Sequence, residues 1–360
     1  MHDLLIVGAG PAGSRLARRF ADRGLDVLAF EKGTVGTPLA CSGHVSTDIW
    51  GFVPDGARDR LRQNTIRGAR FHPDGDAGDS YCFHRDEPIS AVIDRVGLDR
   101  ELAETAREAG AEIRENHTVV GLTERRECVE LAVSGPDGLE HHRGRLVAGC
   151  DGPRSRVRTE TGLPEPDELL HGVLGFSAEP DHEAFVDVHL TVPRFFAWRI
   201  PRGEAGVEYG LATTPGEDVS ARFEAFTDAC GVETDRRCSG LIPVGPPATV
   251  SSGRVFLVGD AAGHNKPFTG GGILYGMTAA DCAAETIEPT EPETLAEYER
   301  AWRAELAADI RLGQLLRAGY SAPRPLQGAL MSVFEGEIGV HMDRPTTLFS
   351  REQLRAMFPV

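Results

Sequence analysis

The stretch LLIVGAGPAG (4–13), followed by SRLARRFADRG (14–24) and by Asp26 to Glu31, determines the fold. The apolar residues before Gly8 predict a buried strand, the next segment has helical apolar spacing, and Asp26 to Phe30 predicts a second strand. The glycines permit a tight turn and the close approach of a pyrophosphate to the helix N-terminus, while Glu31 can accept hydrogen bonds from a ribose. This strand, glycine turn, helix and strand predict a dinucleotide-binding α/β domain.

The next part of the chain extends this sheet. Val96 to Gly110 predicts an amphipathic helix, and Ala111 to Val120 predicts a returning strand. Glu127 to Val133 and Gly144 to Cys150 then alternate as β-structure and end in CDGPRSRVR (150–158), where strand passes to helix. This is a second motif at a strand end.

A third motif, GDAAGHNKPFTGGGI (259–273), follows the apolar strand Val255 to Val258. Asp260 stands at the carboxyl end of that strand, and Gly270 to Gly272 allow backbone N–H groups to approach a ligand where a helix begins. Reduced flavin carries negative charge at its N1–C2=O edge, which a helix N-terminus stabilises. The motif therefore predicts a flavin site.

The three motifs, in this order, resemble the class of FAD-dependent proteins built like p-hydroxybenzoate hydroxylase. The resemblance implies an α/β fold with a Rossmann-like FAD-binding domain of mostly parallel sheet, an inserted antiparallel-sheet substrate domain and a helical C-terminal tail. Alternation in Glu183 to Val192 and Gly206 to Thr213 suits the inserted sheet. The predicted FAD-binding domain comprises residues 1–67, 95–165 and 250–290, the substrate domain 68–94 and 166–249, and the helical region 291–360.

A narrower resemblance lies in PRFFAWRIP (193–201), which is similar to the PxxYxWxFP signature of geranylgeranyl reductases. Phe196 replaces the tyrosine and Ile200 replaces the last phenylalanine. Because alternate residues of a strand point the same way, Phe196, Trp198 and Ile200 are predicted to form one apolar wall, suited to an isoprenoid chain. Ordinary domain core is the alternative interpretation.

The segment from Pro38 to Ser46 is similar to the cysteine loop of that family, which lies beside the flavin; His44 stands where the family usually has glycine. Arg95 and Val119 have alternatives to contact with the cofactor. Arg95 is alternatively a surface cation, and Val119 is alternatively an ordinary core residue. Together, the glycine turn and the resemblance imply FAD contacts at Gly8, Gly10, Ala12, Gly13, Glu31, Cys41, Ser42, His44, Arg95, Val119, Asp260, Gly272 and Ile273.

The resemblance implies an FAD-dependent reductase that saturates isolated double bonds of geranylgeranyl chains, in membrane lipids or prenyl diphosphates, by hydride transfer plus protonation. Such an alkene has no conjugated carbonyl to receive charge, so a proton source is required; Cys41 and His44 are the predicted catalytic residues, with Tyr275 and water as alternatives. A monooxygenase of the same fold and a flavoprotein electron carrier to quinone are the rival functions. No cysteine follows Cys282 to hold the iron–sulfur cluster of related quinone-linked dehydrogenases.

The amino-acid composition limits the kinds of ligand and environment that we expect for the protein. The net charge of −17, with Lys32 and Lys266 as the only lysines, argues against nucleic acid. Acid excess with so little lysine favours adaptation to concentrated salt, although high genomic GC content also replaces lysine by arginine. The seven scattered cysteines have no zinc-like spacing, so no metal is expected.

The sequence does not distinguish NAD(P)H from ferredoxin as the electron donor, because its one dinucleotide-binding motif, the glycine turn at residues 8–13, is assigned to FAD. No apolar run approaches the roughly 18 to 20 residues of a membrane-spanning helix, so a cytoplasmic protein is expected. Gly313 to Val340 is a candidate for peripheral contact with the inner face of the membrane.

Overall fold

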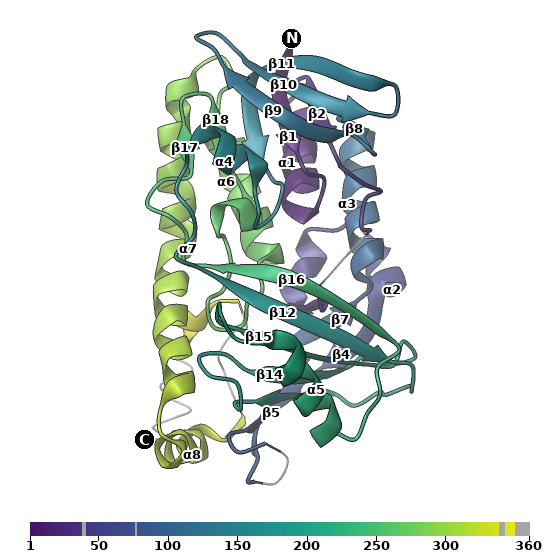
Figure 1. The fold of residues 1–360 in the computed structure, drawn as a ribbon, viewed down its shortest axis with the longest axis vertical. Helices are drawn as coiled ribbons and strands as arrows, with labels where there is room; N and C mark the ends of the chain where they lie inside the picture. Colours follow the sequence, from purple (N-terminus) through teal and green to yellow (C-terminus); the bar gives the residue numbers. More distant parts are fainter. Residues whose placement is uncertain (38–40, 76–77, 338–342, 350–360) are drawn as a thin grey trace.

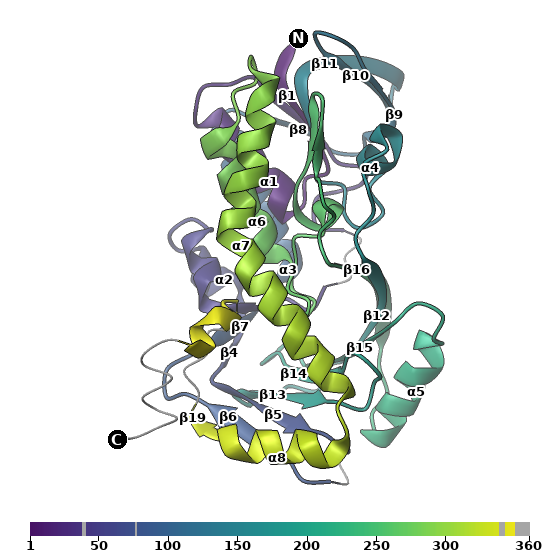
Figure 2. The ribbon, with the colours of Figure 1, turned by 90° about the vertical axis from the view of Figure 1, so that its left-hand side faces the viewer.

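The computed structural model describes residues 1–37, 41–75, 78–337 and 343–349. Two large sheets follow each other along the long axis of the molecule, with the N-terminal one at the top of Figure 1. The long helix α7 (Leu295–Ala318) runs beside both, as Figure 2 shows. The predicted fold class is confirmed: a largely parallel sheet, a separate antiparallel sheet and a helical C-terminal region.

The first sheet is parallel along its central strands, which are β1 (His2–Val7), β2 (Val27–Phe30), β8 (Glu112–Arg114), β11 (Gly138–Gly149) and β18 (Val255–Leu257). An antiparallel excursion through β9 and β10 joins β11. Its path is β17 (Ser251–Ser252), β18 (Val255–Leu257), β11 (Gly138–Gly149), β1 (His2–Val7), β2 (Val27–Phe30) and β8 (Glu112–Arg114), with β10 (Val129–Gly135) and β9 (Thr118–Glu124) off that path.

Helices α1 (Pro11–Ala21), α3 (Arg95–Glu108) and α6 (Ile273–Thr286) lie against this sheet, and α1 packs between the other two. Apolar residues of β1 and β2 are fully buried together with Phe20 of α1 and Trp302 of α7, in the largest core cluster. The short helix α4 (Arg156–Thr161) begins within the second motif.

The returning strand predicted at Ala111 to Val120 is two strands in the structure. The parallel strand β8 ends at Arg114, and the backbone turns at Asn116, whose φ of 57° is left-handed. Asparagine is one of the few residues other than glycine that adopts this conformation readily. The chain then enters β9, which pairs antiparallel with β10.

The second sheet is antiparallel except where β13 meets β5 and where β19 meets β6. Its order is β16 (Arg236–Val244), β12 (Glu168–Ser177), β15 (Val207–Thr213), β14 (Ala197–Pro201), β13 (Phe185–His189), β5 (Gly68–His72), β6 (Tyr81–His84) and β19 (Gly336–Glu337). Helix α5 (Val219–Ala229) packs on β12 and β15 through Phe223. The predicted boundaries between the two domains remain a prediction.

A small antiparallel sheet of β3 (His44–Ser46), β7 (Ser90–Ile93) and β4 (Arg62–Ile66) accompanies helix α2 (Ala57–Leu61). Helix α8 (Arg324–Phe334) lies across the lower end of the molecule in Figure 2, with Leu326 and Leu330 exposed. Within the described ranges, no helix combines the length and the apolar character needed to cross a bilayer.

Candidate functional site

The first glycine turn is tightly packed except on the side open to a ligand. Gly8 has a φ of +97°, and a Cβ atom on it would lie 2.4 Å from the carbonyl oxygen of Cys150. A Cβ on Gly13 would lie 2.0 Å from the carbonyl oxygen of Gly8, so neither position accepts a side chain. At Gly10, by contrast, no heavy atom lies within 4 Å of the Cβ position. The open space is in front of helix α1.

Helix α1 begins at Pro11 with Gly10 as its N-cap and has no capping side chain. Its first-turn N–H groups are therefore free to bind an anion, and the helix dipole favours one. Glu31, at the end of β2, accepts a hydrogen bond from the N–H of Ala9 at 2.9 Å. The carboxylate predicted to bind a ribose thus lies at the turn predicted to bind the pyrophosphate.

The three motifs meet at this turn. Ala12, in α1, packs against the third motif: Cβ atoms on Gly259 and Gly276 would lie 2.9 and 3.3 Å from the Cβ of Ala12. Cys150, which opens the second motif, packs against both Gly8 and Gly13. Segments more than a hundred residues apart therefore build one site.

Asp260 lies at the start of the third motif, against the glycine run. Its Oδ1 atom would be 2.6 Å from a Cβ atom on Gly272, which is the N-cap of α6; Ile273 is the first residue of that helix. Burial raises the pKa of Asp260 to about 6, although Arg95 acts to lower it. A buried carboxylate of this kind favours a ligand that brings hydroxyl donors.

The cysteine loop is held by a buried cation; of this loop, residues 38–40 lie outside the described residues. Arg95 Nε donates to Cys41 Sγ at 3.3 Å, and Arg95 Nη1 donates to Asp99 Oδ1 at 2.7 Å. Arg95 is 6 % exposed, so the surface-cation interpretation is wrong. Burial lowers the pKa of its guanidinium, but Asp99 and Cys41 raise that pKa by more.

His44 begins strand β3 and faces the same region. Its backbone N–H donates to Ser42 Oγ at 3.3 Å, and its Nε2 atom is 2.7 Å from Ser90 Oγ. Burial, together with the nearby Lys266, lowers the pKa of His44 to about 4, while Asp343 opposes this shift. The imidazole is therefore neutral at neutral pH.

The C-terminal segment reaches the third motif through Asp343, which forms a buried ion pair with Lys266. Tyr275 of α6 donates its hydroxyl hydrogen to the carbonyl oxygen of Asp343 at 2.8 Å. Burial raises the pKa of that Tyr275 hydroxyl, so it is a poor acid. Lys266 thus joins the glycine-rich loop to the end of the described chain.

The three predicted wall residues lie in two adjoining apolar clusters. Phe196 packs edge-on against Trp198, with ring centroids 5.7 Å apart, and Ile200 lies in the neighbouring cluster. Trp198 is only partly buried and contacts both clusters. A Cβ atom on Gly270 would lie 3.3 Å from Phe195 Cζ, so this aromatic cluster adjoins the third glycine motif.

Sequence reasoning assigned no role to Glu208 and Arg202, which connect the wall to the cysteine loop. The available signal was one acidic residue in the otherwise uncharged segment from Gly206 to Thr213, which the sequence predicted as a strand. Val119 is brought into the core of the first sheet, and its contact with FAD remains a prediction.

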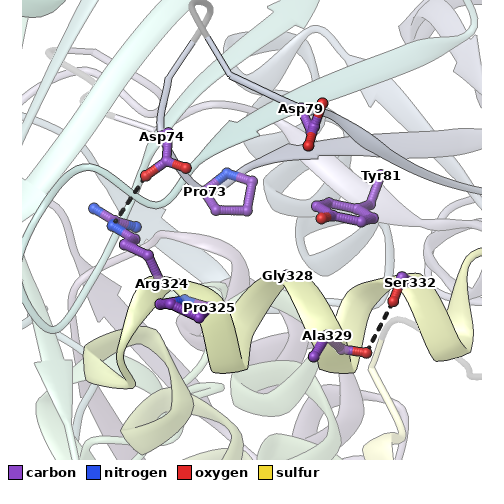
Figure 3. A pocket seen from close by; sticks show the side chains of 9 residues that line it. All are labelled: Pro73, Asp74, Asp79, Tyr81, Arg324, Pro325, Gly328, Ala329 and Ser332. Atoms are coloured by element: carbon purple, nitrogen blue, oxygen red, sulfur yellow. Dashed lines mark hydrogen bonds and ion pairs between the residues drawn. The ribbon is translucent and has the colours of Figure 1, made fainter.

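A surface hollow of about 390 Å³ lies elsewhere, between α8 and the segment joining β5 to β6 (Figure 3). Asp74 and Arg324 pair across it at 3.6 Å. Its lining contains none of the predicted site residues. Sequence and geometry therefore place the candidate site at the three motifs.

The site fits FAD. The uncapped helix and the open space at Gly10 suit a pyrophosphate, while Glu31 and Asp260 suit ribose and ribityl hydroxyls. Among the described residues, Thr269 Oγ1 and both polar atoms of the Asn265 side chain are buried without a hydrogen-bond partner. Such atoms in the third motif indicate a polar ligand or water beside them.

Comparison with known proteins agrees with this geometry. A family model described as an FAD binding domain matches residues 1–229. Digeranylgeranylglycerophospholipid reductase 2 of Methanopyrus kandleri is 31% identical over 348 residues, covering 86% of this chain and 84% of that protein. The digeranylgeranylglycerophospholipid reductase of Methanosarcina acetivorans is 30% identical and covers 88% of this chain and 84% of its own length.

Solved structures share the fold. A geranylgeranyl bacteriochlorophyll reductase-like protein from Thermoplasma acidophilum superposes with a TM-score of 0.87 at 20% identity, covering 99% of this chain and 98% of that one. A p-nitrophenol 4-monooxygenase from Pseudomonas putida gives 0.72 at 19% identity, covering 98% and 95%. From the family match and the sequence relatives, the chain belongs to the FAD-binding family of digeranylgeranylglycerophospholipid reductases and is an FAD-dependent oxidoreductase.

Proposed function

We propose that this protein saturates isolated double bonds of geranylgeranyl chains, in membrane lipids or prenyl diphosphates. The observation that carries the proposal is the aromatic cluster around Phe196 and Trp198, which adjoins the glycine-rich motif assigned to FAD. An apolar wall beside a flavin site suits a hydrocarbon substrate, because burying its surface is favourable at about 25 cal/mol per Å². The names of the sequence relatives support a prenyl lipid as that substrate.

The reaction needs a hydride and a proton at neighbouring carbons. Reduced FAD, when bound, supplies the hydride equivalent. Cys41 is the proton donor in this proposal: Arg95 Nε donates to its sulfur lone pair, which leaves the S–H proton free to point at the substrate. His44 is neutral, so it orients the loop through Ser42 and Ser90 rather than acting as the primary acid.

Around the substrate, this chain excludes water and orients the alkene. Phe196 is buried against Phe195, with stacked rings 4.4 Å apart, and against Tyr320. A dry wall of this kind holds a prenyl chain without specific hydrogen bonds. It also protects the cationic character that develops at the tertiary carbon as the alkene is protonated.

The test is anaerobic incubation of the dithionite-reduced protein with geranylgeranyl lipids, followed by mass spectrometry. We expect the lipid to gain pairs of hydrogen atoms. No gain with several prenyl substrates would contradict the proposal. Conversion that occurs only when oxygen is admitted, with oxygen incorporated into the product, would assign the protein to the monooxygenases instead.

A further inference from the structure

Glu208 is a carboxylate with no exposed surface, at the second position of strand β15. Each of its oxygens has one partner: Oε1 accepts from Trp198 Nε1 at 2.9 Å, and Oε2 accepts from Arg202 Nη1 at 2.8 Å. The indole ring of Trp198 lies over Gly210, where a Cβ atom would be 2.4 Å from ring atoms. Glu208 therefore fixes the indole of the apolar wall in one orientation.

Arg202 continues the connection toward the flavin side. Its Nη1 atom donates to the carbonyl oxygen of Ser42 as well as to Glu208, and its Nη2 atom donates to Gln63 Oε1 at 2.6 Å and to the carbonyl oxygen of Ile93 at 3.3 Å. The planar guanidinium holds these acceptors in a fixed fork. One buried cation thus contacts β4, β7 and the cysteine loop together.

The cysteine loop is held at three consecutive residues. Arg95 donates to Cys41, Arg202 donates to Ser42, and Gly43 packs on Ile93, whose N–H donates to the carbonyl oxygen of Gly43 at 3.0 Å. Gly43 has a φ of +70°, and a Cβ atom there would lie 2.6 Å from the Ile93 carbonyl oxygen. The contact at Ser42 leads directly to the substrate wall, through Arg202 and Glu208 to Trp198.

We infer that Glu208 and Arg202 are positioning residues, which set the place of the cysteine loop relative to the Trp198 wall. The inference rests on the proposed function, because it assigns the wall to substrate and the loop to the flavin side. A buried pair of this kind is weak support for stability, since an apolar replacement often serves as well. Its shared contacts with Trp198 and Ser42 instead give it a geometric role.

The experiment uses the FAD-loaded protein and the variants Glu208→Gln and Arg202→Lys. Glu208→Gln removes the negative charge but keeps the size and shape of the side chain. Arg202→Lys keeps the positive charge but loses the planar guanidinium that holds several acceptors at once. Glu183→Gln, in the half-exposed pair with Arg70, is the matched control. Labelling by N-ethylmaleimide is measured peptide by peptide, with the partly buried Cys150, which Arg202 and Glu208 do not contact, as the internal reference.

We expect labelling of Cys41 to accelerate about tenfold in both variants, with Cys150 changed less than about twofold, because the loop opens locally and not globally. With geranylgeranyl lipid, kcat should fall about tenfold while KM changes less than about threefold, since the wall remains but its place relative to the loop is lost. The control should match the wild type in both measurements.

Unchanged labelling of Cys41 in both variants would overturn the inference, as would equal acceleration at Cys150. If Glu208→Gln does not fold, Arg202→Lys decides alone, because it keeps the ion pair. The labelling needs no prenyl substrate. A failure of the proposed function, seen as no reduction by the wild type, is therefore distinct from a failure of the positioning role.

Discussion

Replacing Asp260 by asparagine should stabilise the protein without FAD and weaken its binding of FAD. Burial raises the pKa of Asp260 from 3.8 to about 6, against the opposing effect of Arg95. Because the folded-state pKa lies above the unfolded one, the favourable contribution of this group is complete below about pH 4 and is lost as the pH rises through about 6. At neutral pH the ionised carboxylate therefore destabilises the FAD-free fold.

The pKa values give the magnitude. A rise of about 2 units corresponds to about 3 kcal/mol at pH 8, and to about 1 kcal/mol at pH 4.5, where the group is still largely protonated in the folded state. These are upper values, since Asp260 keeps some solvent exposure and water screens part of the penalty. Asparagine has no charge to bury, so Asp260→Asn should recover most of this energy.

The assay is denaturant unfolding of the FAD-free protein at pH 4.5 and pH 8, at one salt concentration. The variant should exceed the wild type by at most about 1 kcal/mol at the lower pH and by at most about 3 kcal/mol at the higher pH. Asp59→Asn, at an exposed position, is the control. A difference between Asp260→Asn and wild type that does not change with pH would refute the reasoning.

With FAD bound, the wild type should gain more stability than Asp260→Asn. Ribityl hydroxyls donate to a carboxylate more strongly than to an amide, so binding lowers the pKa of Asp260 and releases a proton. Wild-type affinity should therefore rise by up to about tenfold per pH unit as the pH increases from about 4 to about 6. Titration of FAD by fluorescence quenching measures this slope, which Asp260→Asn should abolish.

Three other variants test the remaining site residues. Cys41→Ser should leave reduction of FAD by dithionite intact and slow prenyl reduction by about 10²-fold or more, measured by mass spectrometry; unchanged turnover would remove Cys41 from the mechanism. Lys266→Met should cost about 3–5 kcal/mol in denaturant unfolding, because it removes the cation that is paired with the buried carboxylate of Asp343, and a second change, Asp343→Leu, should restore most of that loss. Burial lowers the pKa of His44 to about 4 and that of His264 to about 3, so the stability that these neutral side chains contribute is present above about pH 6.5 and is lost as the pH falls. The thermal stability of His44→Gln should therefore depend less on pH in this range than that of the wild type. An identical pH dependence of the two proteins would contradict this.

The sequence predicted the features that depend on local geometry. The glycine turn at Gly8 to Gly13 and the carboxylate of Glu31 follow from spacing, because a strand followed by a helix leaves few ways to bind a pyrophosphate. The division of the returning strand at Asn116 was missed, since the turn there depends on one backbone angle, which the pattern of apolar residues does not report.

Side-chain pairings that form only in the folded structure were not predictable in the same way. Lys266 was conspicuous as one of two lysines, yet its partner Asp343 is one of 55 acidic residues in the chain and lies 77 positions away. Glu208 alternates with apolar neighbours, and only the tertiary structure shows that Arg202 and Trp198 use both of its oxygens. A single sequence carries no direct signal for either pair.

Three ion pairs near the candidate site have one physical property in common that the surface pairs lack. Arg95–Asp99, Arg202–Glu208 and Lys266–Asp343 all have side chains less than 10% exposed. In 1 M salt the Debye length is about 3 Å, so exposed ion pairs are largely screened, whereas buried pairs are screened much less. Charge that positions the site is therefore expected to keep its effect in salt because it is buried. Raising the salt should weaken surface pairs such as Arg70–Glu183 while leaving the contacts around the cysteine loop unchanged.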